Sequence, residues 1–253
     1  MRVLMLGSGT SSGVPRLGGG WGRCDPANPR NRRRRVSLLV EHGPIRLLVD
    51  TSPDLREQLL DAGVSRLDAV LFTHDHADHA HGLDDLRGVF HAMGRPVDCY
   101  MDQPTLRTLT TRFAYAFAGE GGYPRIATAR SLEPELRFGD LRVRPFRQVH
   151  GPVTSTGYRF EADGKAVAYS TDVTDFPPDS RPLLEGLDLW IVEALRREPH
   201  PTHAHLSRTL DWIATFRPRL AVLTHLDQSM DHDELRAELP PGVLPGFDGF
   251  SWP

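Results

Sequence analysis

The sequence predicts an α/β fold in which two β-sheets pack face to face and helices cover their outer sides. Apolar segments of strand length alternate with segments of helical periodicity along the chain. This order occurs in both halves, and no low-complexity linker separates them. A chain of 253 residues also lies near the upper size for one continuous core. We therefore expect a single domain over residues 1–253, built of two similar halves.

In the first half, mostly apolar runs predict strands over residues 2–6, 36–40, 45–49, 67–72 and 96–101. We expect helices over residues 54–62, 82–93 and 103–117. Leu83, Leu86 and Val89 stand at helical spacing, and Gly63 is a stop signal for the helix before it. Residues 16–35 have no periodicity and are rich in Gly, Pro, Asn and Arg, which indicates an irregular segment.

The second half is expected to show the same alternation of strands and helices. Strands are predicted over residues 141–149, 156–161, 166–170, 188–193 and 220–223, and a helix over residues 206–216. Asp163-Gly164 between two of these strands is typical of a hairpin turn. Pro218 ends the helix.

Composition excludes several classes of protein. Hydrophobic content of 39% and charged content of 25% are ordinary for a globular chain. A net charge of −3 provides no general attraction to nucleic acid or membrane. No apolar run has the length of a membrane span, and the start of the chain does not resemble a signal peptide. Two cysteines, Cys24 and Cys99, do not form a disulfide framework. We expect a cytoplasmic protein.

Residues 73–79 are the densest cluster of metal-ligating side chains. The segment contains His74, Asp75, His76, Asp78 and His79, and it lies between a predicted strand and a predicted helix. We therefore expect it to be a loop. Zinc-type cations prefer imidazole nitrogen and carboxylate oxygen. The spacing places these ligands on two sides of the loop, which favours two adjacent metal ions over one.

Further ligands are expected at the ends of other strands. His150, Asp172 and His225 each close a predicted strand in the second half. Taken singly, such a residue is usually a surface group or a hydrogen-bonding partner. Their occurrence together with the dense cluster makes metal binding the better interpretation.

This arrangement resembles the metallo-β-lactamase superfamily, over nearly the whole chain. The resemblance implies a four-layer αββα sandwich. It also implies two divalent metal ions and a role for Asp50 in orienting a ligand histidine. One ion would be held by His74, His76 and His150, the second by Asp78, His79 and His225, and Asp172 would bridge them.

The PhnP branch, which is akin to tRNase Z, is the part of the superfamily that the sequence resembles. The resemblance lies in the glycine- and hydroxyl-rich residues 7–15, residues 28–33, residues 50–54 and residues 81–87. PhnP proteins usually carry a Cys-x-Cys-x-x-Cys segment for a structural zinc ion after the first loop. Here that segment holds Cys24 alone, which argues against such an ion.

The resemblance implies a binuclear phosphodiesterase that uses zinc or manganese and a metal-bridging hydroxide as nucleophile. Small, including cyclic, phosphodiesters or nucleotides would be its substrates. A histidine near neutral pKa suits protonation of the leaving group. His203 matches the family's catalytic histidine best, with His205 as its competitor and His200 third. Asp78 is also expected to be catalytic besides being a ligand.

Other functions stay open at this point. A tRNA 3′-processing nuclease is disfavoured because the chain is slightly acidic and has no extended basic arm. Residues 30–35 form the one arginine-rich run, which could bind phosphate but is better interpreted as a solvated loop. A lactone or ester hydrolase would use the same metals. A non-hydrolytic protein similar to PqqB is disfavoured because every metal-ligand position of the superfamily is filled in this sequence.

We expect no membrane or stable nucleic-acid complex, and the helix at 103–117 could support a homodimer.

Overall fold

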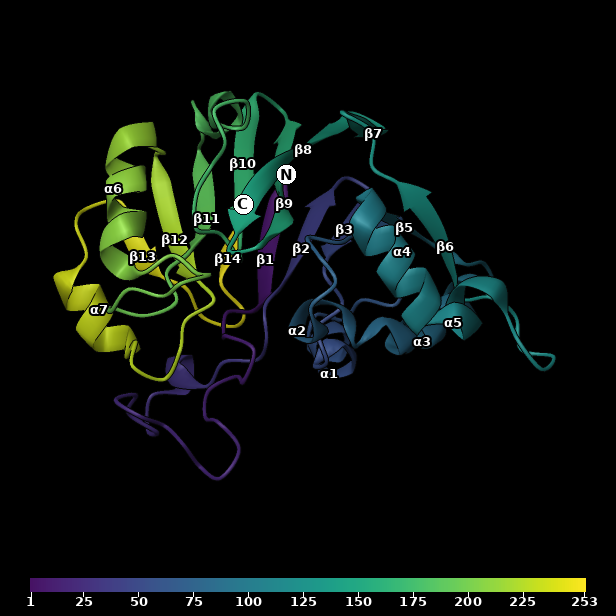
Figure 1. The fold of residues 1–253 in the computed structure, drawn as a ribbon, viewed down its shortest axis with the longest axis horizontal. Coiled ribbons are helices and arrows are strands. Elements are labelled where there is room, and N and C mark those ends of the chain that lie inside the picture. Colours follow the sequence, from purple (N-terminus) through teal and green to yellow (C-terminus); the bar gives the residue numbers. More distant parts are fainter.

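The computed structural model describes residues 1–253, and its strands form two seven-stranded sheets (Figure 1). The first sheet has the order β14-β1-β2-β3-β4-β5-β6. Its strands are β1 (Arg2–Gly7), β2 (Ser37–His42), β3 (Ile45–Val49), β4 (Ala69–Leu71), β5 (Val97–Met101), β6 (Ala127–Ser131) and β14 (Ser251–Trp252). β1, β2 and β3 are antiparallel neighbours, whereas β3 to β6 run parallel.

The second sheet has the order β13-β12-β11-β10-β9-β8-β7. Its strands are β7 (Leu136–Phe138), β8 (Leu141–His150), β9 (Val153–Ala162), β10 (Lys165–Ser170), β11 (Leu189–Glu193), β12 (Leu220–Thr224) and β13 (Val243–Pro245). β7 to β10 are antiparallel, and β10 to β13 run parallel. Asp163 and Gly164 both have positive φ between β9 and β10, so the predicted hairpin turn is confirmed.

Helices cover the outer side of each sheet, which confirms the predicted αββα sandwich (Figure 1). The first sheet carries α1 (Leu55–Asp61), α2 (Ala77–Ala80), α3 (Leu86–Met93), α4 (Gln103–Arg112) and α5 (Ala114–Ala118). The second carries α6 (Leu206–Phe216) and α7 (His232–Glu238). Short 3₁₀ helices lie at Pro29–Asn31, Leu83–Asp85 and Arg181–Leu184. No helix is long and apolar enough to cross a membrane.

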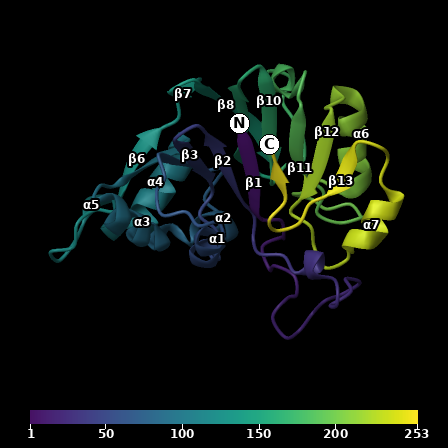
Figure 2. The same ribbon diagram turned by 180° about the vertical axis from the view of Figure 1, so that it is seen from behind.

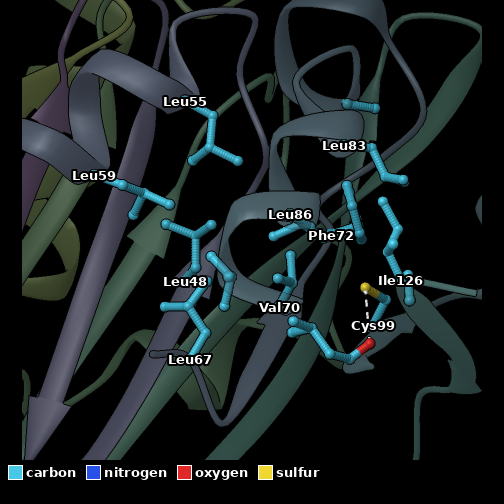
Figure 3. Close-up of a cluster of buried hydrophobic side chains, with 14 of the residues drawn as sticks. Leu48, Leu55, Leu59, Leu67, Val70, Phe72, Leu83, Leu86, Cys99 and Ile126 are labelled. Atoms are coloured by element: carbon cyan, nitrogen blue, oxygen red, sulfur yellow. Dashed lines mark hydrogen bonds between the residues drawn. The ribbon is translucent and has the colours of Figure 1, made fainter. Parts of the chain in front are cut away.

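Three apolar cores separate these layers. One lies between the two sheets, and one lies between each sheet and its helices. Successive strand residues point to opposite faces, so Leu47 and Val49 of β3 enter the inter-sheet core whereas Leu48 enters the helix side. Figure 3 shows Leu48 with Leu55 and Leu59 of α1 in that outer core. Burial on both faces explains why β3 is a nearly continuous apolar run.

The predicted metal-ligand loop is partly helical, which corrects the expectation from the sequence. α2 begins at Ala77, so Asp78 and His79 are helix residues. His76 is the N-cap, and its carbonyl oxygen accepts hydrogen bonds from the backbone N–H groups of His79 and Ala80.

Other differences concern short elements and element ends. The helix predicted over residues 103–117 is broken at Phe113 (φ −117°, ψ 40°), where α5 begins. The break lets the Ala116 carbonyl accept a hydrogen bond from Ile126 N–H. The strand predicted over residues 67–72 is only Ala69–Leu71. The sequence did not predict β6, β7, β13, β14 or α7, because such short segments carry too little periodicity.

Candidate metal centre

The candidate ligands gather where strands of both sheets end. Asp50 follows β3 directly, His225 follows β12 directly, and His150 is the last residue of β8. Parallel strands bring their carboxyl ends to one edge, which is where ligands commonly bind in such sheets. Asp50, Asp172 and His225 have φ values of 62°, 53° and 58°. Non-glycine residues in this left-handed region are strained, and such strain concentrates at functional sites.

His74, His76, His150 and Asp172 form a first group around one point. Oδ2 of Asp172 lies 3.6 Å from Nε2 of His74 and 3.3 Å from Nε2 of His150. Nε2 of His150 lies 3.4 Å from Nδ1 of His76. Four ligand atoms at such separations can surround a single cation.

Asp78, His79 and His225 form a second group beside the first. Oδ2 of Asp78 lies 3.3 Å from Nε2 of His79 and 3.5 Å from Nε2 of His225. Oδ1 of Asp172 faces this group, at 3.1 Å from Nε2 of His79 and 3.5 Å from Nε2 of His225. The two oxygens of one carboxylate therefore face two different sets of histidines.

Unpartnered nitrogen atoms show that the site fits metal ions. Nε2 of His74, His79 and His225 is buried and has no hydrogen-bond partner. Outer carboxylates accept hydrogen bonds from the other ring nitrogen, Asp50 from His79 Nδ1 at 2.7 Å and Glu193 from His225 Nδ1 at 2.8 Å. The Nε2 lone pairs of His79 and His225 are thereby directed inward, as a metal ligand requires.

The charges in the site also favour cations. Burial alone would lower the pKa of His79 and His225, but the carboxylates around them, Asp172 foremost, raise the pKa of His79 well above its usual range and that of His225 to about 10. Burial likewise opposes ionisation of Asp78 and Asp172, yet these histidines hold the pKa of both carboxyls well below the usual value. Burial and the charge of His79 keep the pKa of His74 low, as suits a neutral ligand. The pocket stabilises added positive charge.

Of the three competing histidines, only His203 belongs to such a cluster, a third one that it forms with Asp172, Glu193 and His225. Its Nδ1 donates a hydrogen bond to Glu193 Oε1 at 2.6 Å, and its ring stacks on His225 with centroids 5.1 Å apart. His205 is instead the N-cap residue of α6, without a side-chain capping bond. The His200 ring lies beside His203, with centroids 4.9 Å apart.

Glu193 is a functional residue that the sequence analysis missed. Its buried Oε1 accepts hydrogen bonds from both His203 and His225, and its Oε2 accepts one from Val173 N–H at 2.7 Å. Burial opposes ionisation of Glu193, but the two histidines lower its pKa. Its place offered a signal: like Asp172, it closes a strand, and β11 lies between β10 and β12.

The glycine-rich first loop packs beside the second group. Thr10 N–H donates to the Leu226 carbonyl, and Leu226 N–H donates to the Ser8 carbonyl, so the loop borders His225. Three arginines of the arginine-rich run, residues 30–35, bind other parts of the protein. Arg33 is buried and donates to the carbonyl oxygens of Asp227 and Met230. The run also includes an Arg34–Asp61 and an Arg35–Asp54 ion pair.

Comparison with known proteins identifies the family. The model of the β-lactamase superfamily domain matches residues 45–226. The chain belongs to the metallo-β-lactamase superfamily. It is similar to the crystal structure of a diphosphatase from the PhnP family, at 32% identity and a TM-score of 0.91, with 100% of this chain and 97% of that chain covered. The predicted resemblance to PhnP proteins is thereby confirmed.

Two further similar proteins are informative. An octanoyltransferase of Porphyromonas gingivalis is 36% identical over 98% of this chain, but the chain spans only 51% of that protein. Zinc-bound PqqB from Methylobacterium extorquens shares the fold, at 21% identity and a TM-score of 0.81, with both chains fully covered. The chain thus combines the superfamily fold with clusters of His and Asp side chains that could hold metal ions.

Proposed function

We propose that this protein is a binuclear metal-dependent phosphodiesterase acting on small, including cyclic, phosphodiesters. The observation that carries the proposal is the position of Asp172. Its two carboxylate oxygens face two separate histidine groups, and His203 stands beside them against a buried carboxylate. Paired cations next to an acid–base group suit phosphoryl transfer to water.

The proposed ligands follow the two groups. His74, His76 and His150 would hold one ion, Asp78, His79 and His225 the other, and Asp172 both. Imidazole and carboxylate donors suit zinc and manganese. Bound ions of this kind lower the pKa of a water molecule and offset negative charge on phosphoryl oxygens.

His203 would supply the proton that the leaving group needs. Its Nδ1–H is held by Glu193, so its Nε2 is the nitrogen available to a substrate. In its protonated form, this imidazole can pass a proton to the departing alkoxide. Asp78, besides binding metal, would orient the attacking water.

A small substrate is favoured over a polynucleotide. The net charge is −3, and the arginine run supplies a buried Arg33 and the ion-paired Arg34 and Arg35. A polynucleotide site would need free cationic side chains for several phosphates.

A carboxylic ester hydrolase is the second candidate. The octanoyltransferase relative matches nearly the whole chain, although the chain spans about half of that protein. The same metal ligands could polarise an ester carbonyl as well as a phosphoryl group.

Metal reconstitution tests the proposal. Protein stripped with a chelator is reloaded with zinc or manganese, and bound metal is counted by mass spectrometry. The protein is then assayed with bis(p-nitrophenyl) phosphate, a 2′,3′-cyclic nucleotide, an octanoyl ester, a lactone and a precursor tRNA. We expect two ions per chain and hydrolysis of the phosphodiesters. Hydrolysis of the carboxylic esters alone would contradict the proposal, and two bound ions with no activity would favour a non-hydrolytic role.

The His203→Ala variant tests the proton donor. We expect turnover of a poor alkoxide leaving group to fall by about 10²- to 10⁴-fold, the usual contribution of general acid catalysis. Turnover of the activated p-nitrophenyl ester should change much less, because that leaving group needs little protonation. His205→Ala is the matched control on the same loop and should behave as the unmodified protein. Equal losses on both substrates would remove His203 from this role.

A further inference from the structure

Two residues of β9 hold the backbone that comes just before His74. The Tyr158 hydroxyl donates a hydrogen bond to the Phe72 carbonyl at 2.6 Å, and the Thr156 N–H donates to the Thr73 carbonyl at 2.8 Å. Phe72 and Thr73 follow β4 of the first sheet, whereas β9 lies in the second sheet. A ligand-bearing segment of one sheet is therefore attached to a strand of the other.

The early end of β10 makes room for this attachment. The last pair between β9 and β10 joins Tyr158 to Tyr169, and β10 ends at Ser170. Thr156 therefore has no partner in β10, and its N–H bonds to the Thr73 carbonyl instead. A buried backbone N–H requires such a partner. The end of one strand thus provides the attachment point for a segment of the other sheet.

β9 also supports the remaining ligands of the first group. Its Ser155 hydroxyl donates to the Asp172 carbonyl at 2.7 Å. Its Val153 pairs with His150 at the end of β8. Residues 153–158 therefore support the segments that carry all four ligands of the first group.

The second group is held mainly by other elements. The Thr51 N–H donates to the His79 carbonyl, and Asp50 accepts a hydrogen bond from His79 Nδ1. His225 follows β12, and Glu193 holds its ring. These four supporting contacts come from the loop after β3, from β11 and from β12, and not from β9. The two groups share the bridging carboxylate but differ in what holds their histidines.

We propose that β9 is the positioning element of the first metal group, and that Tyr158 is its positioning residue for His74 and His76. The inference rests on the ligand groups of the proposed function and not on the substrate. Without the hydroxyl, the buried Phe72 carbonyl has lost its donor, which favours a shift of this backbone toward another partner. The ligands that follow would shift with it, and metal affinity depends on such outer hydrogen bonds.

Variants that keep a single metal group test the proposal for each ion separately. His225→Ala keeps the first group and His150→Ala keeps the second. Tyr158→Phe is introduced into both, and zinc affinity is measured by competition with a chelating dye. We expect affinity to fall by about 10-fold or more in the His225→Ala background and to stay nearly constant in the His150→Ala background. A general loss of stability would not distinguish the two ions, because the same folded chain binds both.

Tyr169→Phe is the matched control. Tyr169 stands opposite Tyr158 in the same inter-sheet core, and its buried hydroxyl has no hydrogen-bond partner. In either background this variant should bind zinc as tightly as the background itself. A loss equal to that of Tyr158→Phe would show that the core, and not the bond to Phe72, determines the affinity, and would overturn the inference.

Ser155→Ala tests β9 through its other side-chain contact and does not depend on the folding of Tyr158→Phe. Its partner Asp172 faces both groups, so we expect weaker zinc binding in both backgrounds. Unchanged zinc affinity in Ser155→Ala, or equal losses in both backgrounds for Tyr158→Phe, would contradict the proposal. If neither single-group protein bound zinc, the ligand groups would be wrong and the inference with them. A wrong substrate for the proposed enzyme would leave all these affinities unaffected.

Discussion

Glu193 is a single buried carboxylate that positions two histidines with different proposed tasks. Its Oε1 holds Nδ1 of His225, a proposed ligand, at 2.8 Å and Nδ1 of His203, the proposed proton donor, at 2.6 Å. A carboxylate outside the ligand set commonly orients and strengthens metal-bound imidazoles. Glu193 is well suited to couple metal binding with proton transfer.

The Glu193→Gln variant tests this coupling. The amide has one acceptor oxygen, so either the two histidines or the N–H groups of Val173 and Ala204 lose their partner. We expect zinc affinity, measured by competition with a chelating dye, and turnover each to fall by about 10- to 100-fold. Glu198→Gln, an exposed carboxylate on the following loop, is the control. Unchanged zinc affinity in Glu193→Gln would contradict the role.

At the level of elements, the short helix α2 depends on the loop that follows β3. Thr51 N–H donates to the His79 carbonyl, and Gly82 N–H donates to the Thr51 carbonyl. The same loop carries Asp50, which accepts from His79 Nδ1 and from Thr73 N–H. Two strand-end segments of the first sheet thus hold the cluster in one arrangement.

Two glycine variants measure how closely these segments pack. A Cβ at Gly82 would clash with the Ser52 carbonyl oxygen, whereas a Cβ at Gly88 in α3 would meet nothing within 4 Å. We expect Gly82→Ala to lower the free energy of unfolding by about 2 kcal/mol or more, as overpacking does. Gly88→Ala should raise it by about 0.5–1 kcal/mol through helix propensity. Urea denaturation gives both values, and a neutral Gly82→Ala would show that the loop can move apart.

For the whole molecule, the C-terminal segment connects the two sheets. It leaves β13 of the second sheet and ends as β14 against β1 of the first (Figure 2). Between them, Asp248 accepts hydrogen bonds from the N–H and hydroxyl of Ser8 and from Arg34 N–H. The carboxylate therefore fastens the first loop to the end of the chain.

Asp248 makes stability depend on pH. Burial raises its pKa to about 6, although the hydrogen bonds from Arg34 and Ser8 oppose that shift. As the pH falls through 6, the folded protein binds a proton that the unfolded chain, with a pKa of about 3.9, does not yet bind. The free energy of unfolding therefore rises toward lower pH and falls toward neutral pH.

The Asp248→Asn variant lacks this dependence. We expect the stability difference, unmodified protein minus variant, to increase by about 1 kcal/mol between pH 7 and pH 5. Urea denaturation of both metal-free proteins at pH 7, 6 and 5 measures it, and the titrations shared by both proteins cancel in the difference. A constant or decreasing difference would show that Asp248 is not protonated in this range.

The sequence by itself determined the fold class and the candidate ligands. Strand and helix periods are local properties, and a polar residue that closes an apolar strand is visible without coordinates. His150, Asp172 and His225 were found in this way, and the structure brings them to the dense cluster. Glu193 closes a strand in the same manner, so this local signal was present, but which histidines it would hold depends on the tertiary structure.

Only the tertiary structure decided which histidine of the loop before α6 faces the centre. His200, His203 and His205 have similar local sequence, and their positions depend on partners far away in the chain. Glu193 holds His203, and the turn after β8 packs on Thr202, whose peptide holds His200. Such contacts form when separate strands meet at one edge, so the order of residues along the loop does not reveal them.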